Sequence, residues 1–376
     1  MKIERIDLYH VSQPLVTPFV TSFGGEIDRQ CLIVSMHSGE LESWGECTAD
    51  ASPGYSYETV GTAWHILTDF LIPTLLANEF NDPAALSESF AFVRGHPLAK
   101  SSLDSAAWDL AAQEAGLPLA VMLASAVGVK PKRAVEVGVS IGIQPTIEDT
   151  MTVIEEYLRQ GYKRIKLKIR PGFDLELARA ARSAFPEIRI MLDANSAYSL
   201  KDAELFQEMD DLNLPMLEQP FRVDDIYDHS KLKSQIKTPL CLDESILSVE
   251  HARQAIELGA CDIINIKPGR VGGLTEAMRV HDLCRAADVP VWCGGMLETG
   301  VGRAAQLALA SLPGFTMPGD ISATSRYYAE DIAQPSFILN SEDSTIDVPT
   351  ELGLGVAVNM DRLRRATLRK ATFSAS

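Results

Sequence analysis

Five charged residues recur at even intervals through the middle of this chain, each at the end of a short apolar run. The steps between them are about 25 residues, which is the length of one strand, one helix and two loops. These residues are Lys168 (KLKI), Asp193 (IMLDAN), Glu218 (PMLEQP), Asp243 (LCLDES) and Lys267 (INIKPG). A charged residue at the carboxyl end of each strand is typical of a (β/α) barrel, in which the strand ends surround one mouth. The spacing therefore predicts that three carboxylates and two lysines converge there.

Strand and helix patterns alternate from Val135 onward and predict an α/β fold. The expected strands are 135–141, 164–169, 188–193, 216–219, 240–243, 263–267, 289–293 and 315–319. Eight strands with helices between them match a closed barrel better than an open sheet. We assign residues 126–329 to this barrel domain, which carries the candidate active site.

The residues before the barrel have the pattern of an α+β domain. Residues 2–11, 30–37 and 40–47 alternate as strands do, and helical periodicity follows over 57–76, 82–93 and 99–115. We assign residues 1–125 to this capping domain. The tail, about 330–376, includes a basic stretch (RLRRATLRK) and is expected to pack back on the capping domain and complete it.

Two segments of the capping domain are candidates for covering the mouth of the barrel. Segment 14–26 (PLVTPFVTSFGGE) is rich in Pro, Gly, Thr and Phe without periodicity, so a Gly-hinged lid and an ordinary connector fit it equally well. Loop 47–59 (CTADASPGYSYET) has turn chemistry at Ser52-Pro53-Gly54 and could face a neighbouring mouth.

Composition excludes several classes of function. The net charge of −17 disfavours nucleic acid, because phosphates would be repelled, and gives no attraction to anionic membranes. No run of 18 or more apolar residues is long enough to span a membrane. The six cysteines form no CxxC or Cys/His cluster, which indicates reduced thiols rather than structural zinc. We therefore expect a cytoplasmic protein with neither nucleic acid nor membrane as a partner.

Asp193, Glu218 and Asp243 are candidate metal ligands. Three acids at one mouth repel one another and would have raised pKa values unless a cation neutralised them. Carboxylate oxygens with no His or Cys beside them suit Mg²⁺ better than zinc, with Mn²⁺ as a substitute. The alternative is that each acid caps the helix after its strand, which explains one acid more easily than three in register.

The lysines are candidate acid/base groups. Lys166 and Lys168 lie two apart on one expected strand, so both point to the same face, where burial is costly without a partner or a task. The charge of Lys166 and a nearby dication should lower the pKa of Lys168 and make it a usable base near neutral pH. Lys267 follows four strands further round the ring, almost opposite, where the pair can reach both faces of one carbon. Lys267 could instead be a structural partner of Asp243 or Glu244.

This arrangement indicates a reaction class. A metal held by three carboxylates can bind a substrate carboxylate and stabilise the dianion formed when the adjacent C–H loses its proton. Without that stabilisation the proton is too weakly acidic for a lysine to remove. We therefore expect a small-molecule carboxylate substrate and proton abstraction next to the carboxylate, followed by reprotonation or loss of a leaving group.

The sequence resembles the enolase superfamily, in its muconate lactonizing enzyme subgroup. The resemblance covers nearly the whole chain and rests on the KxK motif of Lys166 and Lys168, on the three acids and on Lys267. It implies a modified TIM barrel, (β/α)7β, capped by the α+β domain, with Mg²⁺ at the acids and a lysine base acting through an enediolate. The late strand ends carry no His, which disfavours the mandelate racemase subgroup.

Within the subgroup, the sequence is most similar to the o-succinylbenzoate synthase / N-succinylamino acid racemase family. The matching stretches are SPGYSYET (52–59), VSIG (139–142), LDANSAY (192–198), EQPF (218–221), LDES (242–245), NIKPGRVGG (265–273), CGGMLETGVGRA (293–304) and PGDISATSRYY (318–328). They imply a lyase that converts 2-succinyl-6-hydroxy-2,4-cyclohexadiene-1-carboxylate to 2-succinylbenzoate by syn dehydration, a step of menaquinone biosynthesis. Lys168 would remove the proton, and Lys267 would stabilise the enediolate or, in N-succinylamino acid racemisation, serve as the second acid/base.

The resemblance also implies roles for residues around these lysines. Arg270 looks like the arginine of members that also racemise, and it is expected to bind substrate. Asn195 would support the metal-bound carboxylate and Glu244 would orient Lys267, although Asn195 also fits a helix cap. The residues expected at the succinyl end of the substrate are Ser140, Gly294, Met296, Ile321 and Ser322, of which the two serines also fit ordinary turns.

Several alternatives stay open. N-acylamino acid racemisation could be the main activity, or the chain could be another cycloisomerase or epimerase of the subgroup. Dipeptide epimerases carry Asp-x-Asp after the eighth strand to hold an ammonium group, whereas this chain has Asp320-Ile321-Ser322, so an acylated or amine-free substrate fits better. A non-catalytic binding barrel is disfavoured, because the chain retains all six polar residues of the candidate site: the three acids, Lys166, Lys168 and Lys267. Barrels of this kind often self-associate, so a homo-oligomer is expected.

Overall fold

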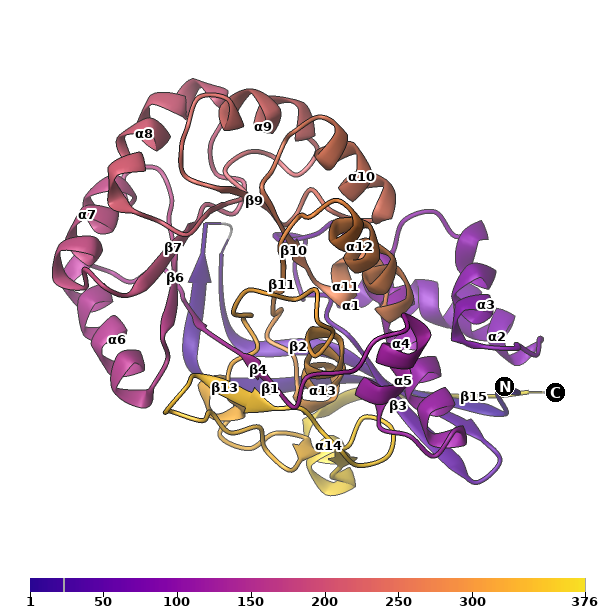
Figure 1. The fold of residues 1–376 in the computed structure, drawn as a ribbon. Helices are drawn as coiled ribbons and strands as arrows, with labels where there is room; N and C mark the ends of the chain where they lie inside the picture. The colour runs from indigo at the N-terminus through magenta and orange to yellow at the C-terminus, as the bar shows by residue number, and fades with distance from the viewer. Residues whose placement is uncertain (23, 376) are drawn as a thin grey trace.

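A four-stranded antiparallel sheet brings the two ends of the chain together. The computed structural model describes residues 1–22 and 24–375. The strands of this sheet, in the order β15-β1-β2-β3, are β15 (Thr367–Ser374), β1 (Arg5–Thr21), β2 (Gly24–Ser38) and β3 (Leu41–Cys47). Because β15 pairs with β1, the chain termini lie side by side at the outer end of this sheet (Figure 1).

Helix α4 packs directly on the first sheet. The helices that follow β3 are α1 (Val60–Ile66), α2 (Ile72–Leu76), α3 (Pro83–Glu88), α4 (Pro97–Glu114) and α5 (Leu119–Ala126). α4 is buried along most of its length, and its backbone at Ser102 and Ala106 touches Gly45 of β3 so closely that a Cβ at Gly45 would overlap the Ser102 carbonyl oxygen. Small residues on both elements therefore allow helix and strand backbones to approach each other.

The second sheet is parallel and has seven strands in the described part of the chain. They are β5 (Val139–Ile141), β6 (Arg164–Lys168), β7 (Arg189–Asp193), β8 (Leu217–Glu218), β9 (Leu240–Leu242), β10 (Ile263–Ile266) and β11 (Val291–Cys293), which neighbour one another in chain order. The connecting helices are α6 (Ile147–Gln160), α7 (Leu175–Ala184), α8 (Ala203–Glu208), α9 (Ile226–Lys233), α10 (Val249–Glu257), α11 (Pro268–Val271), α12 (Leu274–Ala286) and α13 (Gly300–Ala310). The sheet curls, and helices α6 to α10 and α12 cover its outer side (Figure 1). None of the helices in the described residues has the length and apolar character needed to cross a membrane.

The expected eighth strand, 315–319, is not a regular strand, but its segment bonds to both outer strands of the curled sheet. On the β11 side, the backbone N–H of Asp320 donates to the carbonyl of Cys293 at 2.9 Å. On the β5 side, the N–H of Gly138 donates to the carbonyl of Gly319 at 2.7 Å. The residues that follow this segment are thereby fixed at the mouth of the sheet.

The expected first strand, 135–141, is divided in the structure. Its first part forms β4 (Ala134–Glu136), which pairs antiparallel with β13 (Thr345–Asp347), and only β5 joins the parallel sheet. A distant tail segment supplies the partner of β4, so local periodicity could not reveal the division. The tail also contains β12 (Ala333–Gln334), β14 (Ala357–Val358) and α14 (Met360–Ala366).

Segment 14–26 is mostly strand rather than loop. β1 and β2 continue through it as a long hairpin, with an irregular register between Pro14 and Phe19, while residue 23 lies outside the described residues. β15 pairs with β1 only from Arg5 to Val11, so beyond that point β1 is an edge strand, where proline is tolerated. The Val20 carbonyl accepts from the N–H of Ile143 at 2.8 Å, which attaches the hairpin end to the loop after β5. Whether this hairpin opens and closes stays a prediction.

The close contact between β3 and α4 predicts the effect of adding one methyl group. Gly45→Ala should lower the free energy of unfolding by about 1–3 kcal/mol, because the new Cβ meets backbone atoms that cannot rotate away. Gly61→Ala in α1 is the control, since a Cβ there has space and alanine favours a helix by roughly 0.5–1 kcal/mol. Urea denaturation followed by circular dichroism would measure both, and equal stability of the two variants would contradict the packing described.

Candidate active site

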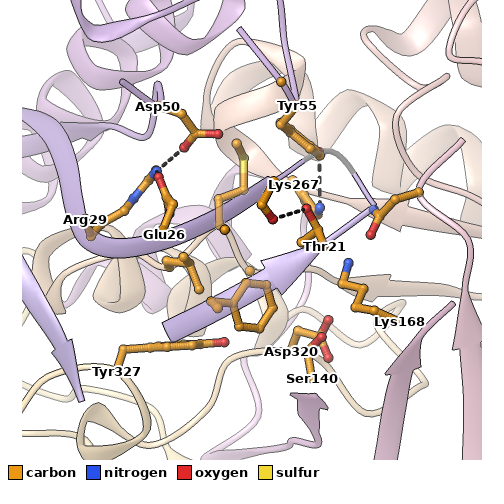
Figure 2. A pocket seen from close by; sticks show the side chains of 18 of the residues that line it. Thr21, Glu26, Arg29, Asp50, Tyr55, Ser140, Lys168, Lys267, Asp320 and Tyr327 are labelled. Atoms are coloured by element: carbon orange, nitrogen blue, oxygen red, sulfur yellow. Dashed lines mark hydrogen bonds and ion pairs between the residues drawn. The ribbon is translucent and has the colours of Figure 1, made fainter. Parts of the chain in front are cut away.

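Strand β6 places three cations on one face. Arg164, Lys166 and Lys168 alternate along it, and all three are buried because the face points into the curled sheet. Lys267 directly follows β10, four strands away in the sheet order. The side chains of Lys166, Lys168 and Lys267 line one cavity. Lys168 and Lys267 are both seen at it in Figure 2.

The three expected metal ligands lie together. Asp193 ends β7 and pairs with Glu218, which ends β8, while Asp243 follows β9 two residues beyond Cys241, the partner of Glu218. Their side chains are fully buried, and one carboxylate oxygen from each lies within 4.8 Å of those of the other two. The three acids, which the sequence spacing predicts to converge, therefore do lie together in the structure.

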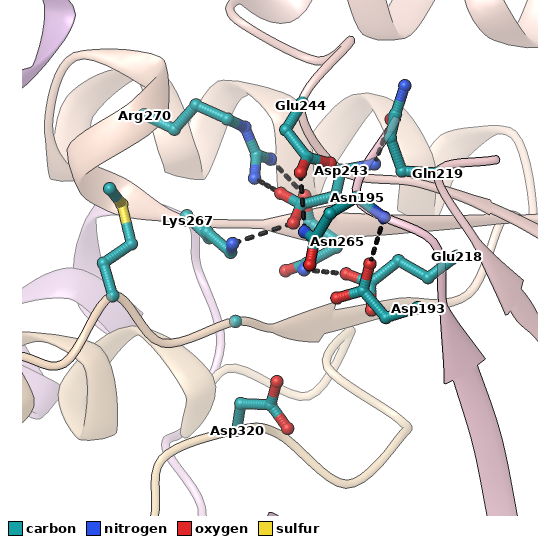
Figure 3. Close-up of polar contacts among 12 residues, drawn as sticks. Asp193, Asn195, Glu218, Gln219, Asp243, Glu244, Asn265, Lys267, Arg270 and Asp320 are labelled. Carbon is teal, nitrogen blue, oxygen red and sulfur yellow. Dashed lines mark hydrogen bonds and ion pairs between the residues drawn. The ribbon is translucent and has the colours of Figure 1, made fainter. Parts of the chain in front are cut away.

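Lysines neutralise these acids in the structure. The amine of Lys168 lies 2.6 Å from Asp193 Oδ2, and that of Lys166 lies 3.1 Å from Glu218 Oε2 and 3.2 Å from Asp193 Oδ2. The amine of Lys267 lies 2.8 Å from Asp243 Oδ2 (Figure 3). The structural pairing of Lys267 with Asp243 thus coexists with its position at the cavity.

Burial and charge shift the pKa values in this cluster. Burial lowers the pKa of the Lys168 amine, and the charge of Lys166 adds to this, although Asp193 opposes it. The direction is the expected one, but burial rather than Lys166 is the main cause. Burial alone would raise the pKa of Asp193, yet Lys168 and Lys166 outweigh it and hold that pKa below its usual range. Burial and the charge of Asp193 raise the pKa of Glu218.

Asp320 is a partner of the cations on β6. Its Oδ2 lies 2.5 Å from the amine of Lys166, and its Oδ1 accepts from Arg164 Nη1 at 2.6 Å. Arg164 also donates to the carbonyls of Pro318 at 3.0 Å and Gly319 at 2.5 Å. Although burial lowers the pKa of Lys166, Asp320 and the neighbouring acids outweigh it and raise that pKa above its usual value. Lys166 therefore stays a cation.

Arg270 lies behind the acids rather than at the cavity, where it was expected to meet substrate. Its Nη1 donates to Asp243 Oδ1 (Figure 3). Its Nε donates to the Ile246 carbonyl at 2.8 Å and its Nη2 to the Asn265 carbonyl. Arg270 can affect substrate only through Asp243 and the backbone around it. Its place three residues after Lys267 in the sequence does not reveal whether the side chain lines the cavity or lies behind the acids.

The expected roles of Asn195 and Glu244 are only partly met by their contacts. Asn195 lines the cavity, and its Nδ2 donates to Glu244 Oε1 at 2.8 Å. Glu244 was expected to orient Lys267, but the hydrogen bonds of the Lys267 amine go to Asp243 and, at 3.1 Å, to the hydroxyl of Tyr55. Tyr55 thus supplies the second hydrogen bond, while, against the effect of burial, the charge of Glu244 acts on Lys267 by helping to raise its pKa.

The capping domain lines one side of the cavity, which has a volume of about 110 Å³. Its capping-domain lining comes from the hairpin end and loop 47–59, namely Phe19, Thr21, Gly24, Gly25, Glu26, Arg29, Asp50, Ser52, Gly54 and Tyr55 (Figure 2). Of the residues expected at the succinyl end, Ser140 and Met296 line it, and the buried Ser140 hydroxyl has no hydrogen-bond partner. The described residues that line the cavity do not include the other three, Gly294, Ile321 and Ser322.

Gly294 and Ser322 support the site from outside the cavity. A Cβ on Gly294 would overlap the Asn265 amide and lie 2.7 Å from Cε of Lys267, so only glycine leaves room for the lysine. The Ser322 hydroxyl donates to the Gly138 carbonyl at 3.3 Å, and Ile321 lies in the apolar core. Because none of the three lines the cavity, their contact with substrate stays a prediction.

The acid cluster fits a hard divalent cation. It offers oxygen donors only, which Mg²⁺ and Ca²⁺ prefer. Further hydrogen bonds orient two of the carboxylates: Asn265 Nδ2 donates to Glu218 Oε1 at 2.7 Å, and Gln219 Oε1 accepts from the N–H of Asp243 at 2.9 Å. The buried Oδ1 of Asn195 has no hydrogen-bond partner, which leaves an acceptor beside the cluster.

Sequence reasoning missed Tyr55, Arg164 and Gln219. Arg164 precedes Lys166 by two residues, so strand periodicity already placed it on the same face. Tyr55 and Gln219 lie within the stretches SPGYSYET and EQPF, but no spacing rule linked them to Lys267 or to Asp243. Their roles depend on contacts between elements distant in sequence.

Metal binding at this cluster can be tested without turnover. Mg²⁺ at 100 times its dissociation constant should stabilise the wild-type protein by about 2.7 kcal/mol, and Asp243→Asn should lose most of that gain. Asp211→Asn removes an exposed acid and should keep it. Thermal unfolding with and without Mg²⁺, each variant against its own metal-free baseline, is the measurement. A full gain in Asp243→Asn would exclude the cluster as the metal site.

Comparison with known proteins places the chain in a family. Residues 5–124 match the mandelate racemase / muconate lactonizing enzyme N-terminal domain, and residues 149–362 match the enolase C-terminal domain-like family. The chain is 48% identical to an o-succinylbenzoate synthase of Bacillus subtilis, covering 100% of this chain and 99% of that protein. It is 46% identical to an N-succinylamino acid racemase of Thermus thermophilus, covering 100% of both. A solved member of the enolase superfamily from Listeria innocua superimposes with a TM-score of 0.94, at 38% identity and 100% coverage of both chains. The chain therefore belongs to the mandelate racemase / muconate lactonizing enzyme family of the enolase superfamily.

Proposed function

We propose that this enzyme is an o-succinylbenzoate synthase that also racemises N-succinylamino acids. It would convert 2-succinyl-6-hydroxy-2,4-cyclohexadiene-1-carboxylate to 2-succinylbenzoate, the menaquinone step expected from the sequence. Relatives named for each activity are similar to it along their whole length at 46–48% identity, which supports both. Racemisation of N-acylamino acids as the main activity is the alternative.

One observation carries the proposal: lysines from strands four apart line the same cavity beside a buried cluster of three acids. Lys168 and Lys267 can therefore approach a bound carbon from two sides. A carboxylate substrate is the group that such a site accommodates, because a cation at the acids and the lysine charges would offset its negative charge.

Asp193, Glu218 and Asp243 are the residues that would hold Mg²⁺, with Mn²⁺ as a substitute. When bound, the ion would supply positive charge that stabilises the negative charge developing on the substrate carboxylate as the proton leaves. The lysines around the three acids keep the cluster intact before the ion binds, since each acid has a cationic partner within 3.2 Å.

In the dehydration, Lys168 would act as base and then as acid. Its amine takes the proton from the carbon next to the carboxylate, and the C–H electron pair stays on the substrate. The C–O bond then breaks, and Lys168 returns the proton to the departing hydroxide, so that water leaves and the ring becomes aromatic. The lowered pKa of Lys168 suits the first step, and Lys267 keeps its proton throughout as a fixed positive charge.

In the racemisation, both lysines would transfer protons. One takes the α-proton on its own face, and the other gives a proton to the opposite face of the same carbon. Lys166 serves neither step directly, because its amine is surrounded by Asp193, Glu218 and Asp320, and it contributes fixed positive charge beside Lys168.

The contacts of Asp320 favour an acylated or amine-free substrate. An acid that holds a substrate ammonium needs uncompensated negative charge at the cavity, but the charge of Asp320 is already balanced by Lys166 and Arg164. A dipeptide with a free amino group would have to break this buried ion pair, which is costly.

The finer features of the fold are also part of this proposal. We propose that the curled sheet acts as a closed (β/α)7β barrel, since segment 315–320 bonds to both of its outer strands. The division into residues 1–125 completed by 330–376, and 126–329, is supported by the pairing of β15 with β1. Self-association and a cytoplasmic location stay predictions.

Replacing the proposed base gives a direct test. Lys168→Ala should slow formation of 2-succinylbenzoate by roughly 10²–10⁴-fold, the typical contribution of a positioned acid/base group, while Mg²⁺ binding persists. Lys201→Ala, which removes an exposed lysine, is the matched control and should leave the rate unchanged. Product absorbance measures the rate and calorimetry the metal binding. Wild-type rates in Lys168→Ala would remove Lys168 from the role of base.

Substrate preference tests the class of reaction. The synthase substrate and several N-succinylamino acids should be turned over in the presence of Mg²⁺ and not after EDTA treatment, whereas free dipeptides should react much more slowly, because Asp320 is engaged. Product absorbance for the synthase substrate and polarimetry for the amino acids and dipeptides measure this. A dipeptide epimerised as fast as the best N-succinylamino acid would contradict the proposed substrate class.

A further inference from the structure

Tyr55 lies where the capping domain meets Lys267. It belongs to loop 47–59 and lines the cavity beside that lysine (Figure 2). Its hydroxyl lies 3.1 Å from the Lys267 amine and 3.4 Å from Asp243 Oδ1, and the amine lies 4.7 Å from the centre of the tyrosine ring. The tyrosine therefore contacts the lysine through both its ring and its hydroxyl.

The hydrogen bonds of Lys267 fix the direction of its amine. An ammonium group has three N–H bonds, and here one is directed to Asp243 Oδ2 at 2.8 Å and another to the Tyr55 hydroxyl at 3.1 Å. Because two bonds are held by partners on different elements, the group cannot rotate freely about its last carbon bond. The third N–H is left for the cavity, where the substrate carbon would lie.

The loop that presents Tyr55 is itself firmly held. The buried carboxylate of Glu58 accepts from the N–H groups of Leu98 at 2.8 Å and Ala99 at 3.1 Å, at the start of α4. The Asp50 carbonyl accepts from the N–H of Val60 at 2.8 Å. Both ends of the loop are thus anchored in the capping domain. The position of Tyr55, and of the hydrogen bond that it makes with Lys267, therefore depends on how the capping domain packs on the parallel sheet.

We propose that Tyr55 is a positioning residue for Lys267, and that it supports racemisation more than dehydration. This inference rests on the proposed function. In racemisation the N–H of Lys267 must be aimed at the substrate carbon, because a proton passes between them and the alignment of reacting atoms strongly affects the rate. In dehydration Lys267 only supplies charge, which changes little with a small rotation of the amine.

Tyr55→Phe is the direct test, because it keeps the ring and removes only the hydroxyl. N-succinylamino acid enantiomers would be incubated separately in D₂O with saturating Mg²⁺, and α-proton exchange followed by NMR. The enantiomer that still exchanges in Lys168→Ala is the one whose proton faces Lys267. Its exchange should fall on the order of tenfold or more in Tyr55→Phe, as expected for one hydrogen bond to a charged group. Exchange of the other enantiomer and 2-succinylbenzoate formation should fall much less.

Tyr57→Phe is the matched control on the same loop. The hydroxyl of Tyr57 accepts from the N–H of His96 at 3.2 Å and its side chain is 56% exposed, so its removal should change none of the three rates. Equal losses of all three rates in Tyr55→Phe, or no loss in any, would overturn the inference while leaving the proposed function intact. A wild-type protein that exchanges neither enantiomer would contradict the proposed racemisation and overturn the inference with it.

Mg²⁺ affinity distinguishes the contact of the Tyr55 hydroxyl with Lys267 from its contact with Asp243. Calorimetric titration of Tyr55→Phe with Mg²⁺ should give the wild-type dissociation constant, because the hydroxyl contacts Asp243 only at 3.4 Å. A weakened affinity that accounts for the loss of exchange would show that Tyr55 acts through the metal ligand, and would overturn its role toward Lys267.

Discussion

The need to neutralise buried charge governs the centre of this protein. Five carboxylates and five cations are buried together at and behind the strand-end side of the cavity, and the formal charges of this group cancel. The acids are Asp193, Glu218, Asp243, Glu244 and Asp320, and the cations are Arg164, Lys166, Lys168, Lys267 and Arg270. An unpaired charge in such surroundings would be costly, so each side chain constrains its neighbours. A divalent cation would leave the site positive, which suits a substrate whose carboxylate gains negative charge during the reaction.

The parallel strands and the capping domain have different tasks in this arrangement. The strands set the register that brings the acids and Lys168 to one end of the sheet, as the pairing of Lys168 with Asp193 and of Asp193 with Glu218 shows. The hairpin of β1 and β2 and loop 47–59 line the cavity above them. The hydroxyl of Tyr55 links the two parts at Lys267, so packing of the capping domain and orientation of a reactive group are connected.

Much of this could be predicted from the sequence, because strand spacing is a local property. The steps between Lys168, Asp193, Glu218 and Asp243 predict that the three acids converge, and the structure shows them clustered. Contacts made across elements could not be predicted in this way. Arg270 has the spacing of a lining residue, yet it turns behind Asp243, and the predicted strand 135–141 divides because the distant β13 pairs with its first half. The hairpin at 14–26 was also obscured, because its prolines suggest a loop and are tolerated only where β1 becomes an edge strand.

The central claim is that two amines approach one carbon from opposite sides, above a metal held by three acids. A crystal structure with Mg²⁺ and 2-succinylbenzoate would test it most directly. The account predicts a single ion coordinated by Asp193, Glu218, Asp243 and the ligand carboxylate, with the adjacent ring carbon between the amines of Lys168 and Lys267. An ion bound elsewhere, or both amines on the same side of that carbon, would contradict it.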